Sequence, residues 1–394
     1  MNQILNGVLV FGKHDQNTLD QIVMCKNTEA AHAVLCADGH YGYNHPIGGV
    51  VALKEKISIS AVGFDIGCGN LAVRLDAKRS DIAPKINTIM DDIVKNISFG
   101  VGRTNNLPVD HPVLHDPLFQ TEPYKSWLAD ATAQLGTVGS GNHYVDIFAD
   151  ENDDVWVGVH FGSRGLGHKT ATHFLKAAGA DNSMAAPPCI VDASTALGSD
   201  YIAGMKLAGE YAYAGRQQVV DVVTKMLGAT VLESIHNHHN FAWLEDHFGE
   251  DFWVVRKGST PAFPGQKGFV GGSMGDNAVI LEGVDSELSK KALYSTVHGA
   301  GRIMSRNAAK GKFVKDAAGK KQRQPGLVRH DEMVKWLSEK GVVLRGGDLD
   351  EAPQAYRRLP DVIADQGETV RVIRTLQPLG VAMAGSDIID PYKD

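Results

Sequence analysis

The sequence has few cysteines, no long hydrophobic run and no excess of positive charge, and each absence argues against a class of protein. The four cysteines, Cys25, Cys36, Cys68 and Cys189, show no paired spacing. A disulfide scaffold is therefore not expected, and reduced thiols remain available as metal ligands. No apolar run reaches the roughly 18 residues that span a membrane. The opening MNQILNGVLVFGKHD has neither a basic start nor a small-residue cleavage site, so we expect a cytoplasmic protein without membrane contact.

The charge balance limits how this chain can bind nucleic acid. Its formal net charge is −7, whereas a protein that binds nucleic acid through bulk charge is basic. Any contact with RNA must therefore be local, through a patch of arginine and lysine, or be aided by metal ions that the formal count omits. The 43 glycines and 16 histidines suit a site built from tight loops and metal ligands.

The chain shows no repeat, no heptads, no low-complexity tract and no sharp linker. Apolar and helical patterns mix without regular alternation, which predicts an α+β fold in one compact domain over residues 1–394. Strands are expected at 48–54, 58–64, 70–75, 143–148, 155–160, 252–256, 277–282 and 369–376. Helices are expected at 80–96, 123–135, 168–179, 199–228, 286–293, 330–340 and 352–365, with a loop at 100–122.

Six potential metal ligands or nucleophiles lie beside glycine turns or at predicted strand ends. They are Asp65 and Cys68 in GFDIGCG, His143 in GSGNH, His160 at the end of VWVGVH, His239 in HNHHN and His298 in HGAGR. A strand end is a rigid platform, and a glycine turn lets the backbone approach a ligand. Imidazole, carboxylate and thiolate together suit a transition metal, and a thiolate can bridge two ions.

Each of these residues also has a simpler interpretation. A single strand-end histidine is usually a polar residue at a loop mouth, and Cys68 can be a small buried apolar residue. Asp65, near glycines, can be a turn residue. The spacing does not match paired Cys-x-x-Cys zinc patterns. Composition and spacing alone therefore leave both a metal site and a structural role open.

The order of the motifs along the chain resembles the RtcB family of RNA ligases. The matching segments are DGHYGYNHPIGGV (38–50), VGFDIGCG (62–69), GTVGSGNH (136–143), HFGSRGLGH (160–168), HHN (238–240), RKG (256–258), GGSMG (271–275), HGAGR (298–302) and EAPQAY (351–356). Together they cover nearly the whole chain. The resemblance implies an α+β domain with mixed and antiparallel sheets around a dinuclear metal site.

The resemblance also implies a role for each matching residue. The expected ligands of two manganese ions are Asp65, Cys68 (bridging), His143, His160 and His239. His298 is the expected nucleophile that takes GMP from GTP. The expected guanylate pocket consists of Asn142, Asp146, Asn240, Ser273, His298, Ala300, Gly301, Tyr356 and Lys393. Arg164 and Arg302 are expected to hold phosphate or RNA.

The activity implied is GTP- and manganese-dependent joining of RNA ends through a guanylylated histidine. One RNA end carries a 3′-phosphate or a 2′,3′-cyclic phosphate, and the other carries a 5′-hydroxyl. The implied process is tRNA splicing or RNA repair. An activating protein is a possible partner. Two alternatives stay open. A metal-dependent phosphoesterase that opens cyclic phosphates would not need His298, and a non-catalytic RNA-binding relative would have lost metal ligands.

The chain departs from the family pattern in several places. Asp146 stands where the family usually has Glu, Gly271 where it commonly has Pro, and Gly39 where a larger residue often sits. Many members carry a lysine near the C-terminus that contacts the guanylate, and the matching position here is Met383. We predict that Lys393 replaces this ammonium, and that the altered tail marks a divergent subfamily.

A lysine-rich stretch within 306–326 is the other notable charge feature. Lys310, Lys312, Lys315, Lys320, Lys321 and Arg323 occur there among alanines and glycines. Such a run is either a local RNA-binding patch or a solvated surface, and the sequence leaves both interpretations open.

Overall fold

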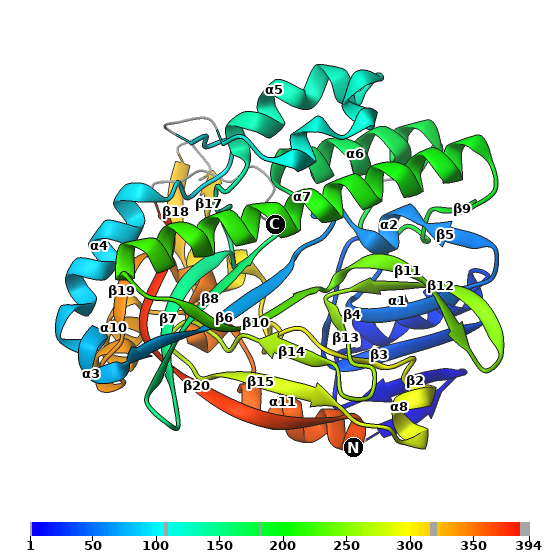
Figure 1. Ribbon diagram of the computed structural model, residues 1–394. Helices are drawn as coiled ribbons and strands as arrows, with labels where there is room; N and C mark the ends of the chain where they lie inside the picture. The colour runs from blue at the N-terminus through cyan, green and yellow to red at the C-terminus, as the bar shows by residue number, and fades with distance from the viewer. Residues whose placement is uncertain (1, 106–108, 182, 316–320, 387–394) are drawn as a thin grey trace.

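Two sheets form the framework of the protein in a computed structural model that describes residues 2–105, 109–181, 183–315 and 321–386 (Figure 1). The first sheet has the strand order β1-β2-β3-β4-β12-β11. Its strands are β1 (Asn2–Leu5), β2 (Val8–Phe11), β3 (His32–His40), β4 (Ile47–Leu53), β11 (Asn240–His247) and β12 (Glu250–Lys257). The β2–β3 pair is parallel and the other pairs are antiparallel, so the sheet is mixed.

The second sheet has the order β10-β6-β8-β7-β20-β15-β14, with β19 parallel to β20. Its strands are β6 (Gly69–Lys78), β7 (Tyr144–Asp150), β8 (Asp154–Phe161), β10 (Val231–His238), β14 (Lys267–Val270), β15 (Ala278–Gly283), β19 (Val343–Gly347) and β20 (Val370–Gly385). Three strand pairs stand apart: β5 (Lys56–Ser58) with β9 (Ile190–Asp192), β13 (Ser259–Pro261) with β16 (Ser295–Val297), and β17 (Gly311–Lys315) with β18 (Lys321–Pro325).

Helices of very different length cover these sheets. The longer ones are α1 (Gln16–Asn27), α4 (Ile86–Asn96), α5 (Tyr124–Gln134), α6 (Arg164–Ala177), α7 (Ala196–Leu227), α10 (His330–Glu339) and α11 (Leu359–Gln366). The short ones are α2 (Ile59–Val62), α3 (Arg79–Ile82), α8 (Glu287–Lys291) and α9 (Arg306–Lys310). Helix α7 runs across the molecule beside α6 (Figure 1). Among the described residues, no helix is long and apolar enough to cross a membrane.

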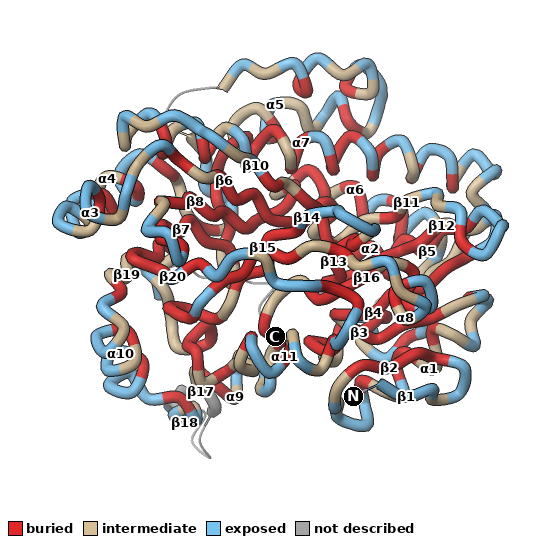
Figure 2. The backbone as a smooth tube through the Cα atoms, turned by 60° about the horizontal axis from the view of Figure 1, so that its bottom comes forward, coloured by how far each residue is buried: buried red, intermediate tan, exposed pale blue. Residues whose placement is uncertain are grey.

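Successive side chains of β8 point to opposite faces of the second sheet and are buried on both. Val155, Val157 and Val159 belong to a core cluster that also contains residues of α4 and α7, while Trp156 belongs to the cluster on the other face. This is the two-residue period of a strand buried on both sides. Figure 2 shows the same central strands as buried. The sheet is therefore a rigid base for the side chains at its strand ends.

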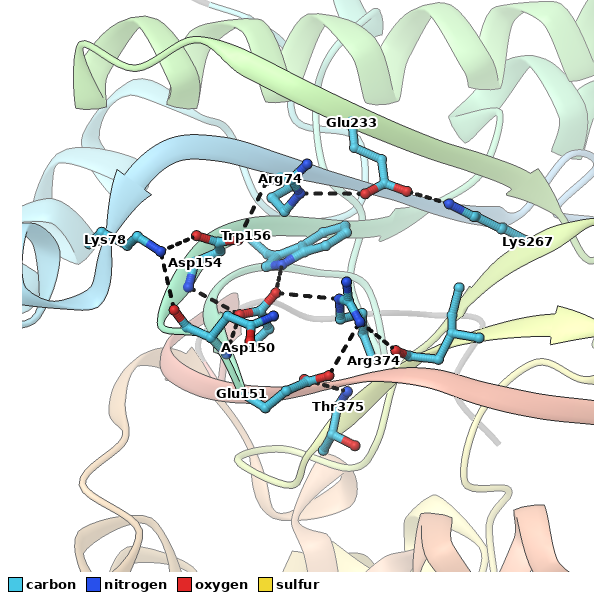
Figure 3. Close-up of polar contacts among 12 residues, drawn as sticks. Arg74, Lys78, Asp150, Glu151, Asp154, Trp156, Glu233, Lys267, Arg374 and Thr375 are labelled. Carbon is cyan, nitrogen blue, oxygen red and sulfur yellow. Dashed lines mark hydrogen bonds and ion pairs between the residues drawn. The ribbon is translucent and has the colours of Figure 1, made fainter.

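Polar side chains tie the strands of this sheet to one another (Figure 3). Asp150 Oδ2 accepts a hydrogen bond from Trp156 Nε1 at 3.0 Å. At the sheet edges, Lys267 of β14 pairs with Glu233 of β10 at 2.6 Å, and Asn70 Nδ2 donates to Phe269 O at 2.8 Å. Because β10 and β14 are the two outer strands of the path, these contacts show that the sheet curls and brings its edges together.

The α+β class and mixed sheets are confirmed, as are most predicted elements. The predicted strands that match observed ones correspond to β4, β6, β7, β8, β12, β15 and β20, and the predicted helix 199–228 corresponds to α7. The predicted strand at 58–64 is wrong. Ser58 caps a short helix there by accepting a hydrogen bond from Ala61 N, and Gly63 ends it with φ +87°.

Two helix predictions placed the boundaries wrongly. The segment 352–365 contains a short 3-10 turn at Pro353–Ala355, and its α-helix begins only at Leu359, just before Pro360. Ala352, the residue before Pro353, is extended (φ −61°, ψ 150°), as is typical before a proline, and Tyr356 and Arg358 are extended too, so one helix cannot run through the segment. The helix at 80–96 is similarly interrupted by a 3-10 turn at Ala83–Lys85, which contains Pro84. The loop at 100–122 is largely confirmed in its described part, with 3-10 turns at Pro112–His115 and Pro117–Gln120.

A buried ion pair stabilises the β11–β12 hairpin. Arg256 is fully buried, and its guanidinium donates to both oxygens of Glu245 at 2.7 and 3.0 Å and to Leu293 O at 2.9 Å. Burial raises the pKa of Glu245, but Arg256 and His247 outweigh that effect and hold it below its ordinary value. The carboxylate is therefore ionised at neutral pH and neutralises the buried arginine.

Glu245→Gln should lower the free energy of unfolding at pH 7 by about 3 kcal/mol, because it leaves a buried guanidinium without its counter-charge. The deficit should shrink as the pH falls through the depressed pKa of Glu245, where the wild type loses the same charge. Denaturant unfolding measures both effects. The matched control is Glu250→Gln, which removes an exposed pair with Lys54 and should cost less than about 1 kcal/mol. Equal stability of the two variants would contradict the prediction.

Candidate active site

Five predicted metal ligands meet where the second sheet borders the first. His143 directly precedes β7, His160 lies near the end of β8, and Cys68 directly precedes β6. His239 separates β10 from β11, and its amide donates to Cys68 O at 2.8 Å. Asp65 lies in the turn that ends at Cys68, whose amide donates to Asp65 O at 3.0 Å. Backbone contacts thus hold together segments that are far apart in the sequence.

The ligand atoms form two groups that share one thiol. One group is Asp65, Cys68 and His143, the other is Cys68, His160 and His239, and the atoms in each lie within 4.8 Å of one another. Cys68 Sγ lies 3.3 Å from His160 Nε2 and 3.7 Å from His143 Nε2. His143 Nε2 lies 3.1 Å from Asp65 Oδ2. This arrangement suits two cations with Cys68 between them.

The protonation of the imidazoles also fits metal binding. His160 Nδ1 donates to Asn142 O at 3.0 Å, which leaves the Nε2 lone pair directed at His239 Nε2, 3.3 Å away. Burial holds the pKa of both His160 and His239 well below the ordinary value, so both rings are neutral. Two neutral imidazoles with ring nitrogens this close, beside a thiol and a carboxylate, could serve as the donor set of a transition metal.

His298 lies beside this cluster and is oriented by an aspartate. Its ring centroid lies 4.9 Å from that of His239. Asp38 Oδ2 accepts hydrogen bonds from His298 Nδ1 at 2.6 Å, from the His298 amide at 2.9 Å and from the Gly299 amide at 3.2 Å. Burial raises the pKa of Asp38, but His298 outweighs that effect and holds it below its ordinary value. The Nε2 lone pair of His298 is therefore the free one.

Asp38 is a site residue that the sequence analysis did not single out. It is completely buried at the end of β3, whereas Asp-Gly in sequence indicates an exposed turn. Its position within the first glycine-rich motif was the only signal for it.

These residues border a cavity of about 760 Å³. Its wall contains most of the predicted site residues: Asp65, Cys68, Asn142, His143, Asp146, His160, His239, Asn240, Ser273, His298, Ala300, Gly301, Arg302 and Tyr356. Arg164 does not line it. A Cβ atom on Gly139 would lie 2.1 Å from Arg164 Nη1 and 2.3 Å from His143 Nδ1, so the guanidinium lies behind His143. Lys393 lies outside the described residues.

At the end of the cavity next to β7 and β20, oxygen atoms without hydrogen-bond partners in the described part of the chain lie beside apolar side chains. Asp146 Oδ1 and Ser273 Oγ are buried and have no hydrogen-bond partner among the described residues. Burial raises the pKa of Asp146 well above its ordinary value. Met274 and Met383 line the same end. Unpaired buried polar atoms beside apolar side chains are typical of a pocket for a flat polar ligand.

Gly271, a departure from the family pattern, is explained by its neighbour. A Cβ atom there would lie 2.4 Å from Tyr144 Oη, so the hydroxyl takes up the space that a larger residue would need. Tyr144 pairs with Met383 across β7 and β20. Tyr144 and Met383 both line the cavity. Tyr144 therefore contacts the positions of two departures from the family pattern, Gly271 and Met383.

Arg302 is held by neighbouring groups rather than extended into open space. Its Nη1 donates to Tyr356 Oη at 2.8 Å and lies 3.3 Å from Glu351 Oε2, while Nη2 donates to Asp350 O at 2.7 Å. The guanidinium also lies 4.8 Å from the centroid of the Tyr356 ring. Arg302 therefore fixes the position of Tyr356 in the cavity wall.

Known proteins of similar sequence indicate the family of the chain. A family model described as tRNA-splicing ligase RtcB matches residues 21–127 and 120–384. The chain belongs to the RtcB family. Its curated relatives include the RNA-splicing ligase RtcB of Escherichia coli K12, 31% identical over 379 residues that cover 88% of each chain. Two archaeal relatives named tRNA-splicing ligase RtcB come from Thermococcus kodakarensis (28% identical) and Archaeoglobus fulgidus (29% identical), each covering 89% of this chain and 87% of its own.

A fully buried arginine of α7 lies beneath the candidate metal ligands. Arg216 Nη1 donates to Gly67 O at 2.8 Å and to Phe161 O at 2.6 Å, next to Cys68 and His160. Its Nη2 lies 3.0 Å from His238 Nδ1, next to His239. One side chain thus contacts the neighbours of three candidate ligands, as supporting residues of metal sites do.

Arg216→Lys should weaken binding of Mn²⁺ to metal-stripped protein by roughly tenfold or more, because one ammonium cannot reach all these acceptors. Isothermal titration calorimetry measures the dissociation constant, and melting in chelator shows whether the variant remains folded. Arg74→Lys, which changes a partly exposed arginine of β6, should leave the constant unchanged. A dissociation constant for Arg216→Lys equal to that of the wild type would show that Arg216 does not position the ligands.

Proposed function

We propose that this chain, acting as one domain over residues 1–394, is a GTP- and manganese-dependent RNA ligase. It would join an RNA 3′-phosphate or 2′,3′-cyclic phosphate end to a 5′-hydroxyl end, in tRNA splicing or RNA repair. The observation that carries the proposal is the position of His298, oriented by Asp38 and adjacent to two potential metal groups that share Cys68. The names of its relatives, RNA-splicing and tRNA-splicing ligases, support the same activity.

His298 is the proposed nucleophile of the first step. Asp38 accepts the Nδ1 proton, so Nε2 carries the lone pair. Attack of Nε2 on the α-phosphorus of GTP forms a P–N bond and breaks the bond to pyrophosphate, which leaves GMP on the histidine. Asp65, Cys68, His143, His160 and His239 would hold two manganese ions, which when bound would offset negative charge on the phosphates.

The apolar end of the cavity is the proposed guanylate site. Guanine presents two N–H donors on one edge, and Asp146 Oδ1 is an acceptor without a partner among the described residues. Ser273 offers a second unpaired oxygen, and Tyr356 lies in the same wall. Asn240 is already engaged, since its Oδ1 accepts from Gly258 N at 2.7 Å and its Nδ2 donates to Asp65 O at 3.3 Å. We therefore assign Asn240 the role of holding the Asp65 turn.

The remaining steps follow from the chemistry of a guanylylated histidine. An oxygen of the RNA 3′-phosphate attacks the phosphorus of GMP, which breaks the P–N bond and returns the lone pair to Nε2. The 5′-hydroxyl of the second RNA then attacks the activated 3′-phosphate, forms the new phosphodiester and releases GMP. Arg302, which lines the cavity, is the proposed phosphate or RNA contact, whereas Arg164, which lies behind His143, is proposed to act through that histidine.

The two alternatives receive less support from the site. A cyclic-phosphate phosphoesterase has no use for the Asp38–His298 pair, whose hydrogen bond is 2.6 Å long. A non-catalytic RNA-binding relative would not be expected to retain all five potential ligands within the two compact groups. That Lys393 supplies an ammonium to the guanylate, and that a separate protein activates the enzyme, stay predictions.

Incubation with Mn²⁺ and radiolabelled GTP should transfer label to the wild-type protein and none to His298→Ala. Asp38→Asn should slow labelling by roughly 100-fold or more, because an amide at this position favours the wrong histidine tautomer. Gel analysis of the denatured protein measures the label. Asp20→Asn, at an exposed position of α1, is the control and should label at the wild-type rate. An unlabelled, folded and metal-loaded wild type would overturn the ligase proposal in favour of the phosphoesterase.

A further inference from the structure

The loop between β3 and β4 is held by side chains from several elements. Gln21 of α1 is buried, and its amide makes a reciprocal pair with the Gly42 backbone. Nε2 donates to Gly42 O at 2.5 Å and Oε1 accepts from Gly42 N at 3.1 Å. Asn44 adopts φ +56°, and its Nδ2 donates to Ser183 O at 3.0 Å and Ala186 O at 3.2 Å. The loop is therefore fixed on both of its sides.

A buried lysine holds the same loop from the first sheet. Lys257 is 6% exposed, and its Nζ donates to Tyr43 O at 2.7 Å. Among the described residues, no carboxylate forms an ion pair with it. Burial lowers the pKa of Lys257 to about 8. Burying a cation without a counter-charge is costly, so the rigidity of this loop comes at the expense of stability, as is common where a surface is preorganised for a ligand.

This rigid loop contributes two tyrosines to the cavity wall. Tyr41 and Tyr43 line it together with Phe64 and Met184, and Tyr43 is 39% exposed. The ring of Phe64 stacks on His168, with centroids 5.2 Å apart and planes inclined by 27°. Aromatic side chains fixed on a braced loop lose little entropy when a flat ligand stacks on them.

The location of these residues indicates what they contact. Tyr41 and Tyr43 lie between β3 and β4 of the first sheet, and Phe64 directly precedes the potential ligand Asp65, whereas Asp146 and Met383 lie on β7 and β20 of the second sheet. If guanylate occupies the second-sheet end, as proposed above, an RNA end can approach His298 along the first-sheet end. The net charge of −7 argues against capture of RNA by bulk charge, so base stacking can add affinity to what a metal centre or a local basic patch supplies.

We propose that Tyr41, Tyr43 and Phe64 form a stacking platform for the terminal bases of a single-stranded RNA end. The inference rests on the proposed ligase function and adds to it a binding site for the RNA bases. The platform is insensitive to base identity, because every base presents a flat face. It therefore suits an enzyme that must accept different RNA ends beside a fixed reacting centre.

The test is fluorescence anisotropy of the full-length, Mn²⁺-loaded protein with short single-stranded RNA probes. One probe ends in a 3′-phosphate and carries its dye at the 5′ end, and a second has a free 5′-hydroxyl and carries its dye at the 3′ end. Each is also made with its three terminal bases at the reacting end replaced by abasic sites. The double variant Tyr41→Ala/Tyr43→Ala is compared with wild type. Two further variants serve as controls: Tyr43→Phe keeps the ring, and Phe248→Ala removes a 58% exposed ring outside the cavity.

We expect the double alanine variant to bind at least one intact probe roughly tenfold or more weakly than wild type. Tyr43→Phe and Phe248→Ala should match wild type, and the abasic probes should remove the difference between wild type and double variant. The platform would be overturned if wild type and the double variant bound both intact probes equally well. It would also be overturned if the double variant lost as much affinity for the abasic probes as for the intact ones, or if wild type bound no probe. Labelling of His298 by GTP needs no RNA, so it tests the ligase proposal separately. The two experiments together show whether the ligase function or the stacking platform has failed.

Discussion

The structure depends on the convergence of two groups of donors on one thiol. Asp65 and His143 form one group with Cys68, and His160 and His239 form the other. Imidazole nitrogens, a thiol and a carboxylate lie 3.1 to 3.7 Å from one another there. This spacing suits cations between them, and we propose that metal ions bind there. The segments that carry these donors are held at their ends by the curled second sheet and by α7. The buried Arg216 of α7 makes the contacts from the helix.

Electrostatics explains how an acidic protein can handle anionic substrates. The chain carries a net charge of −7, and several of its cationic side chains near the cavity are occupied by internal partners. Arg302 pairs with Glu351, and Arg216 and Lys257 donate to backbone carbonyls. Positive charge for triphosphate and RNA phosphates would therefore come mainly from the metal centre. Affinity for the rest of the RNA would come from uncharged contacts such as stacking.

Sequence motifs predicted which residues meet at the site better than they predicted what supports them. His143, His160 and Cys68 were identifiable because unusual side chains beside glycines mark a site wherever the fold places it. Asp38 was missed because its buried strand ends in turn-like residues, and Arg216 because an arginine in a long helix normally faces solvent. Strands β10 and β11 were missed for a related reason: their polar residues are buried only by tertiary contacts. Local sequence does not record which polar groups the fold will bury.

Two metal ions are proposed to share Cys68, and anomalous X-ray diffraction at the manganese edge tests this most directly. Crystals of the Mn²⁺-loaded protein should show two anomalous peaks, both within bonding distance of Cys68 Sγ. One peak should also touch Asp65 and His143, and the other His160 and His239. A single peak, or two peaks of which neither contacts Cys68, would contradict the account, since the donors would then belong to a different site.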